Sequence, residues 1–370
     1  VYLTLETIGL YDFRVCMVVD VFALSGLTVL CCATARQLRG HAKYTDAFFP
    51  FAILHWGQAE NLFWNIQLVF VMGACMNLIA LSCLVRPTQS ARSALILGLC
   101  TVSMPLIGGH GLALVPALGL CTLSAAVELR KGGARRALWS SVAALGVLSL
   151  ALTGFYFVDY VRPAKHPVSP SLEATFRSGM QFLSMSFGTG QRVFWPWGGY
   201  LIAGLLLTTT AALLARMTRP AERQRAFRLL LFFGAMTTLA FGVGWARAGF
   251  YPHGMFVSRY ATLAIPLACG IYFAWEALGP SRLTRFMQAT LFVIATLLVL
   301  RNHDDGLMEA RSGHPLRAAF RSEVDRGTPI HELDKKYCRT IYYTCKGGLL
   351  GERLRMLREL EVPGFDKLPD

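Results

Sequence analysis

Long apolar stretches separated by short polar connections run through residues 1–300 of the chain. A helix that crosses a bilayer needs about 20 consecutive apolar residues, and most of these stretches approach that length. The pattern therefore predicts an all-α fold, a polytopic transmembrane helix bundle. The segments 44–54 and 93–107 are shorter than a full membrane crossing. Such short or re-entrant segments are tolerated inside a membrane only where other parts of the protein cover them. The ten apolar segments are 15–34, 44–54, 62–85, 93–107, 110–128, 137–157, 197–216, 228–247, 260–279 and 286–300.

Basic residues concentrate in every second connection between these segments. Cytoplasmic connections of membrane proteins carry an excess of Lys and Arg. The alternation predicts that these connections are cytoplasmic, and that the N-terminus, the loop 158–196 and the C-terminal region lie on the other side. The basic residues of the five connections include Arg36, Arg39 and Lys43, then Arg86 and Arg92, then Arg130, Lys131, Arg135 and Arg136, then Arg216, Arg219, Arg223, Arg225 and Arg228, then Arg282 and Arg285.

The composition agrees with a membrane protein. Hydrophobic residues make up 54% of the chain and charged residues only 16%, with a mean hydropathy of +0.45. Soluble domains carry roughly a quarter charged residues, so a soluble or disordered chain is excluded. The net charge of +14 is explained by the basic connections. The expected partners are therefore membrane lipids, with no nucleic acid.

Residues 301–370 differ from the rest, because they hold 13 basic and 12 acidic residues and no apolar run. They predict a small, mainly helical extracytoplasmic domain. Cys338 and Cys345 lie in it, and disulfides persist in oxidising compartments such as the periplasm. The β-branched and aromatic segment 339–346 suits a strand or tight hairpin, and a bridge needs the chain to turn there. Two unpaired thiols remain the alternative.

The loop 158–196 contains a pattern typical of an amphipathic helix near 170–187. Ser169 is suited to the N-cap and Pro170 to the first turn. An apolar stripe with low overall hydrophobicity favours a helix that lies along the membrane surface. A helix packed on the C-terminal domain is the alternative. The stripe consists of Leu172, Phe176, Met180, Leu183 and Phe187.

Polar side chains suited to chemistry gather in the connections on the predicted outer side. His55 and Glu60 lie in a short connection between apolar segments. They either face a water-filled cavity inside the protein or belong to a turn at the membrane interface that is exposed to solvent. Asp20, within the first apolar segment, is expected to be structural and satisfied by a neighbouring helix. Arg grips phosphate in two places at once, so the cluster before 260–279 favours a lipid-linked phosphate over snorkelling to headgroups. That cluster consists of Arg247, His253, Arg259 and Tyr260.

Several local patterns resemble the GT-C superfamily of membrane glycosyltransferases, which take sugars from polyprenyl-phosphate carriers. Residues 12–40, Asp-Phe-Arg followed by an apolar helix and Ala-Arg-Gln-Leu-Arg-Gly, resemble the passage out of the family's first large loop. The paired segments in 93–128, broken by Gly-Gly-His-Gly, are similar to its short central hairpin. Residues 258–266, Ser-Arg-Tyr-Ala-Thr-Leu-Ala-Ile-Pro, resemble its "Pro-Arg-Tyr-Leu-Leu-Pro-x-x-Pro" helix start. Residues 46–64 resemble passages of uncharacterised bacterial relatives.

The resemblance implies a bacterial inner-membrane enzyme that transfers a sugar from a polyprenyl-phosphate carrier to an extracytoplasmic acceptor with inversion. Arg259 would bind the lipid phosphate, supported by Arg247, His253 and Tyr260, while Glu60 and His55 would serve as acid-base or acceptor-binding groups. No cofactor and no metal ligand is assigned. No acidic pair occurs in residues 1–300, so we expect a fragment that lacks the first helix and the principal catalytic carboxylate. A complete chain that lacks the activity is the alternative.

Two other classes of function stay open. A transporter or lipid flippase also uses broken helices inside the membrane, although the two halves of this sequence show no internal repeat. A non-catalytic assembly subunit would use the C-terminal domain as its contact surface.

Overall fold

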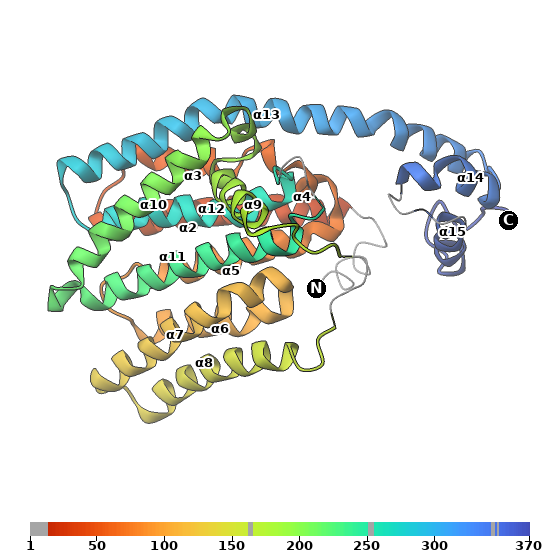
Figure 1. Cartoon of the computed structure of the whole chain (residues 1–370). Coiled ribbons are helices and arrows are strands. Elements are labelled where there is room, and N and C mark those ends of the chain that lie inside the picture. The colour runs from red at the N-terminus through yellow and green to blue at the C-terminus, as the bar shows by residue number, and fades with distance from the viewer. Residues whose placement is uncertain (1–13, 162–165, 251–254, 342–344, 346–347) are drawn as a thin grey trace. The chain divides into compact units, whose positions relative to one another are not determined.

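The structure, a computed structural model of the chain, describes residues 14–161, 166–250, 255–341, 345 and 348–370 (Figure 1). The regular elements within these ranges are α-helices and short 3-10 helices, without a strand. The predicted all-α fold is thus confirmed for the described residues. They divide into a larger bundle unit, Met17–Gly306, and a smaller C-terminal unit that includes Leu307–Asp370.

The helices of the bundle unit follow the apolar segments of the sequence. Among the described residues, six helices are long and apolar enough to cross a membrane, which makes the chain a multi-pass membrane protein: α2 (Arg14–Arg39), α7 (Gly109–Lys131), α8 (Arg136–Tyr156), α10 (Trp197–Arg216), α11 (Pro220–Arg247) and α13 (Arg282–Asp325). The others are α3 (Phe48–Ile53), α4 (Ala59–Phe63), α5 (Leu68–Leu84), α6 (Ala91–Ile107), α9 (Leu172–Ser184) and α12 (Ser258–Ala277).

The segment 44–54 differs from the single thin crossing predicted for it. It forms a 3-10 turn, Tyr44–Ala47, followed by α3, which has six residues. At 1.5 Å per residue, α3 is about 9 Å long, far short of the roughly 30 Å of a bilayer core. Phe49 stacks on Phe273 of α12 with ring centroids 5.1 Å apart. The broken segment is therefore held inside the bundle by protein contacts.

Helix α12 forms the centre of the bundle unit. Of its 20 residues, 18 are buried, and it contacts α5, α9, α10, α11 and the short elements α3 and α4. Such a helix presents apolar residues on all sides because protein surrounds it. Its length of 20 residues corresponds to about 30 Å, so its two ends lie at opposite ends of the bundle.

The basic connections meet at one end of the bundle unit, which we call the basic end. Arg39, at the end of α2, forms an ion pair with Glu276 near the end of α12 (Nη1 to Oε2, 2.9 Å). Arg228 of α11 pairs with Glu128 near the end of α7. Figure 1 shows the α7–α8, α10–α11 and α12–α13 connections together on the left. The membrane face that this end meets stays a prediction.

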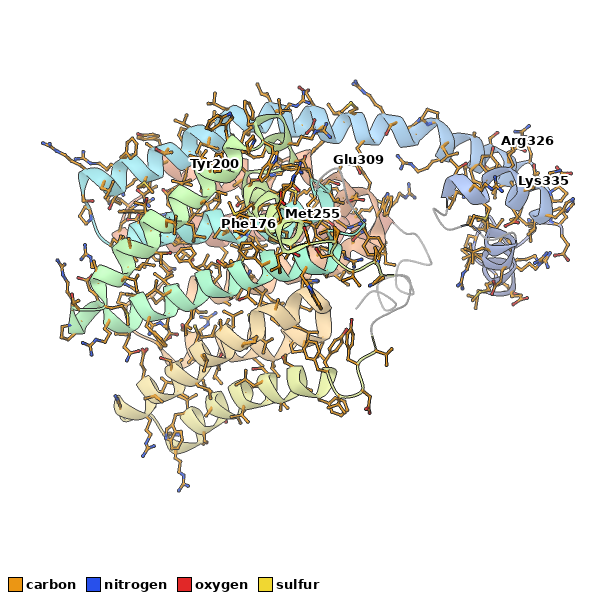
Figure 2. The ribbon with its side chains drawn as sticks, viewed as in Figure 1. Phe176, Tyr200, Met255, Glu309, Arg326 and Lys335 are labelled. Atoms are coloured by element: carbon orange, nitrogen blue, oxygen red, sulfur yellow. A yellow bond between two sulfur atoms is a disulfide. The ribbon has the colours of Figure 1, made fainter. Side chains whose placement is uncertain are left out.

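Helix α9 lies against α11, α10 and α12 within the bundle unit. Ser171, and not Ser169, is its N-cap, because its Oγ accepts a hydrogen bond from the backbone N–H of Ala174 at 3.0 Å. The predicted stripe is only partly buried: Phe176 is 59% exposed, whereas Gln181, expected on the polar side, is buried. Gln181 Oε1 accepts a hydrogen bond from the backbone N–H of Met255 at 2.8 Å. Figure 2 shows the side chains of Phe176 and Met255 in this part of the bundle unit. Whether α9 also rests on the membrane surface stays a prediction.

The C-terminal unit combines the last part of α13 with α14 (Ile330–Ile341) and α15 (Leu349–Glu359). Cys338 and Cys345 form a disulfide with their Cα atoms 5.7 Å apart. The prediction of a strand or hairpin for residues 339–346 is wrong for the first residues of this segment, because α14 continues to Ile341. The reason is the helical spacing of the residues that α14 buries, which outweighs the β propensity of its last turn. They are Ile330, Leu333, Tyr337 and Cys338.

Candidate functional site at the N-terminus of the buried helix

The side chain of Glu60 caps the N-terminus of α12. Its Oε2 accepts hydrogen bonds from the backbone N–H of Arg259 at 3.0 Å and from Ser258 Oγ at 3.2 Å. Its Oε1 forms an ion pair with Arg259 Nη1 at 3.2 Å. The first N–H groups of a helix lack partners within the helix, and they carry partial positive charge. The Glu60 carboxylate and the Arg259 guanidinium thus form an ion pair at the start of α12, where the helix itself favours a bound anion.

The connection that carries Glu60 is fastened to α12 by two amide side chains. Asn61 Nδ2 donates to the carbonyl oxygen of Arg259 at 2.9 Å and to Thr262 Oγ1 at 2.5 Å. Thr262 Oγ1 in turn donates to Gln58 Oε1 at 2.5 Å. Gln58 and Asn61 are fully buried, so these bonds satisfy the Gln58 oxygen and the Asn61 amino group, which would otherwise be costly to bury. The spacing between Glu60 and Arg259 is therefore set by the chain around them.

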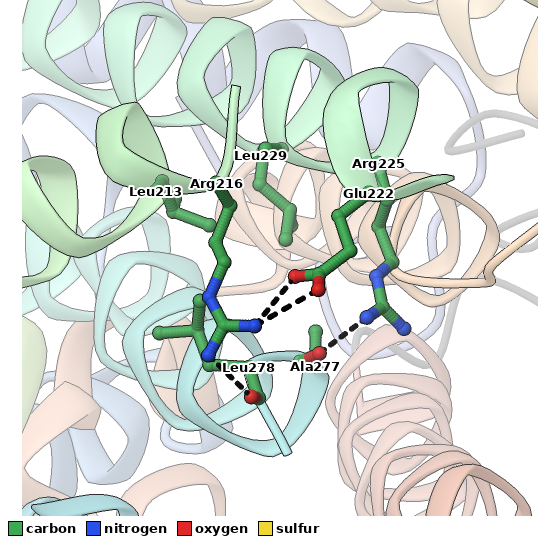
Figure 3. A pocket seen from close by; sticks show the side chains of 8 residues that line it. Leu213, Arg216, Glu222, Arg225, Leu229, Ala277 and Leu278 are labelled. Atoms are coloured by element: carbon green, nitrogen blue, oxygen red, sulfur yellow. Dashed lines mark hydrogen bonds and ion pairs between the residues drawn. The ribbon is translucent and has the colours of Figure 1, made fainter. Parts of the chain in front are cut away.

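The opposite end of α12 carries the complementary charges. Arg216 Nη2 donates to the carbonyl oxygen of Leu278 at 3.0 Å, and Arg225 Nη2 donates to that of Ala277 (Figure 3). Glu222 holds Arg216 through both carboxylate oxygens, at 2.8 and 2.9 Å. The hollow between these side chains is only about 10 Å³, the size of one water. The side chains around this hollow stabilise the end of α12, and the hollow has no room for a substrate.

Glu60 and Arg259, predicted as separate groups, are brought together and both stay partly accessible. The side chain of Arg259 is 22% exposed and that of Glu60 is 12% exposed. The Arg259 guanidinium also lies over the ring of Tyr260, 5.5 Å from its centroid. Tyr260 itself is buried, and its ring packs edge-on against Phe70 at 5.8 Å. Tyr260 thus packs against the Arg259 guanidinium, and its contact with a phosphate stays a prediction.

Of the other predicted phosphate-binding residues, Arg247 alone lies among the described residues. The Arg247 guanidinium lies 5.3 Å from the centroid of the Phe250 ring. His253 lies outside the described residues. A grip on one phosphate by Arg247 and Arg259 together stays a prediction.

The side chain of His55 is fully buried, so the prediction of a solvent-exposed turn at this residue is wrong. It is 0% exposed, and neither ring nitrogen has a hydrogen-bond partner among the described residues. Burial, reinforced by the nearby His303, lowers the pKa of His55 to about 3. His55 is therefore neutral at pH 7 and closed to a solvent-borne acceptor. An acid-base role for it finds no support in this geometry.

Asp20 also departs from its prediction. It is fully buried in α2, and neither carboxylate oxygen has a hydrogen-bond partner among the described residues. The expectation that a neighbouring helix satisfies it is therefore wrong. No group of three or more His, Cys, Asp or Glu side chains among the described residues is arranged to hold a metal ion.

The sequence reasoning missed the residues that assemble the site, namely Gln58, Asn61, Ser258 and Thr262. The available signal was the pair of amides three residues apart beside Glu60, inside an otherwise apolar and aromatic stretch. Two buried amides need partners, and the partners are nearly 200 residues away in the sequence.

No protein-family model matches the chain, and no curated protein and no solved structure matches it either. The fold and the pair at the end of α12 define a multi-pass helical membrane protein with a partly buried carboxylate–guanidinium pair at one end of its bundle.

Proposed function

We propose that the chain is an integral-membrane glycosyltransferase that moves a sugar from a polyprenyl-phosphate carrier to an acceptor on the extracytoplasmic side. The observation that carries the proposal is the Glu60–Arg259 pair at the N-terminus of α12. A helix N-terminus together with an Arg is a favourable place for a phosphate. The resemblance to the GT-C superfamily supplies the substrate class.

In the proposed reaction, the lipid phosphate takes the place of Glu60 as the partner of the Arg259 guanidinium. Glu60 Oε2 keeps its hydrogen bonds to the start of α12, while Oε1 is released to face the acceptor. The released carboxylate accepts the proton of the acceptor hydroxyl as its oxygen bonds to the anomeric carbon. The bond from that carbon to the phosphate oxygen breaks, and the phosphate leaves on the lipid carrier. Arg259 stabilises the charge that develops on it.

The test measures binding of undecaprenyl phosphate to the purified protein in nanodiscs. Arg259→Lys and Arg259→Ala each lose the planar fork, and a charge-assisted contact contributes about 1.5–3 kcal/mol. The expected loss of affinity is therefore about 10- to 150-fold. Arg285→Ala is the matched control, because Arg285 is an exposed arginine beyond the far end of α12. Wild-type affinity in both Arg259 variants overturns the phosphate site.

A second variant separates binding from chemistry. Glu60→Gln retains an acceptor for the start of α12 but removes the negative charge that competes for Arg259. We expect it to bind undecaprenyl phosphate at least as tightly as the wild type and to lose sugar transfer from an undecaprenyl-phosphate-linked sugar. A transfer rate equal to that of the wild type would remove Glu60 from the reaction.

The unpartnered carboxylate of Asp20 favours a transporter or flippase as the second candidate. An ionisable group buried within a membrane helix is by default a mark of a substrate or proton pathway. Reconstituted protein that moves labelled undecaprenyl phosphate across vesicles, and loses this activity in Asp20→Asn but not in Glu60→Gln, would favour this class over the transferase.

A further inference from the structure

A groove of about 500 Å³ lies along α2 near its C-terminal end. One wall is a stripe of α2, consisting of Thr28, Val29, Cys32 and Ala33, and the other includes Ala47 and Pro50. The four α2 residues share one helix face because they recur at intervals of three and four positions. Val29 is 68% exposed, so the groove opens at the side of the bundle where membrane lipid would contact it. The walls are apolar and formed by small side chains.

Two basic side chains, Arg36 and Lys43, line the same groove. Arg36 follows Val29 by seven residues, which places its Cα about 10 Å further along the helix axis. The groove is thus apolar over one part of its length and basic over the next. An amphiphile with an apolar chain and an anionic head matches this order.

The acidic residues at this end are already engaged, so they do not cancel the positive charge of the groove. Asp46 pairs with Arg39 and accepts hydrogen bonds from Tyr272 OH at 2.8 Å and from the backbone N–H of Lys43 at 2.9 Å. Glu276 pairs with Arg39 at 2.9 Å and lies 3.5 Å from Lys43 Nζ. The two carboxylates offset Arg39 and Lys43, which leaves the charge of Arg36 unmatched. Arg36 is exposed and has no ion pair among the described residues.

We infer that this groove binds one anionic phospholipid of the membrane leaflet at the basic end. One acyl chain lies between the stripe of α2 and the wall formed by Ala47 and Pro50. The phosphate group lies at Arg36, with Lys43 as its second contact. The site is separate from the Glu60–Arg259 pair, because Glu276 and Arg259 mark opposite ends of α12. It does not depend on the proposed transferase activity.

The test titrates delipidated protein with phosphatidylglycerol and, separately, with phosphatidylcholine, and counts bound lipids by native mass spectrometry. A basic residue at a membrane surface contributes about fivefold to the binding of an anionic lipid. Arg36→Gln should therefore lower the affinity for phosphatidylglycerol about fivefold. Phosphatidylcholine should bind the wild type more weakly than phosphatidylglycerol does, and Arg36→Gln should leave the affinity for phosphatidylcholine unchanged. Arg282→Gln is the control, because Arg282 is an exposed arginine close to the end of α12.

A second variant tests the apolar half of the groove without changing charge. Ala33→Trp should fill the space and remove the tight phosphatidylglycerol, whereas Leu207→Trp, on an exposed position of α10, should not. Thermal unfolding checks that both variants fold. The inference is overturned if Arg36→Gln and Ala33→Trp both bind phosphatidylglycerol like the wild type. It is also overturned if Ala33→Trp changes only the oligomeric state, since the groove then receives a second copy of the chain.

Discussion

The buried guanidinium of Arg228 gives a direct test of how the basic end is held together. Arg228 lies near the start of α11 and is 0% exposed. Its Nη1 pairs with Glu128 of α7, and its Nη2 donates to the carbonyl oxygen of Arg86 at 2.8 Å. Its Nε donates to the carbonyl oxygen of Leu84 at 3.3 Å, at the end of α5. One side chain thus connects three helices through a carboxylate and a helix C-terminus, where a cation is favoured.

The size of the effect follows from what each substitution leaves behind. Arg228→Met keeps the length of the apolar stem but leaves Glu128 without its partner, and breaking a buried pair costs about 3–5 kcal/mol. The Glu128 side chain is 20% exposed, so water relieves part of that cost and we expect about 3 kcal/mol. In Arg228→Met with Glu128→Gln no charge is left buried, and we expect about 1–2 kcal/mol from the carbonyl groups that lose a donor.

The assay is denaturant-induced unfolding of the purified protein in detergent for the two single variants and the double variant. The double variant should be more stable than Arg228→Met alone by about 1–2 kcal/mol, so the effects of the two substitutions are not additive. Arg285→Ala, which removes an exposed arginine at the same end, should change the stability by less than about 0.5 kcal/mol. Additive effects of Arg228→Met and Glu128→Gln would refute the reasoning.

Three further predictions concern other parts of the chain. Burial lowers the pKa of His55 to about 3, so the unfolded chain takes up a proton first as the pH falls below about 6.5. The stability advantage of the wild type over His55→Gln should therefore shrink by about 2 kcal/mol between pH 7.5 and pH 5. Parallel pH profiles of the two proteins would contradict this prediction. Reduction of the Cys338–Cys345 disulfide should destabilise the C-terminal unit by about 2.5 kcal/mol, and two alkylated thiols in the unreduced protein, seen by intact mass, would show that no bridge forms. Cysteines placed at the exposed positions Glu173 and Thr88 should react with an impermeant thiol reagent from opposite sides of the membrane, and reaction from the same side would reject the orientation.

The helices of the bundle were predictable because their signal is local. An apolar run of 15 to 24 residues has few alternatives to a membrane helix, and the basic connections indicate which helix ends meet. The predictions for 44–54 and for Gln181 failed for a different reason. Phe49 is buried by Phe273 and Gln181 is engaged by Met255, and partners that distant in sequence leave no periodic mark near the residue itself.

The candidate site shows the same division between local and distant information. Glu60 and Arg259 were both singled out, because each is a charge beside an apolar helix. Their pairing was not predicted, since the residues that bring them together are the buried amides Gln58 and Asn61 and their hydrogen-bond partners on α12. His55 looked equivalent to Glu60 in the sequence, yet the fold buries its ring beside His303. Exposure, which separates the two residues, is a property of the tertiary structure.

The charges at the two ends of α12 link its stability to its proposed chemistry. A buried helix carries partial positive charge at its start and partial negative charge at its end, and α12 meets Glu60 at the first and Arg216 with Arg225 at the second. A phosphate bound at Arg259 would bring to the start of α12 the same sign of charge that Glu60 supplies. In the proposed reaction, Oε1 of the carboxylate would then face an acceptor while Oε2 keeps its hydrogen bonds to the helix start. The proposed exchange would let one carboxylate cap the central helix of the bundle and also accept a proton.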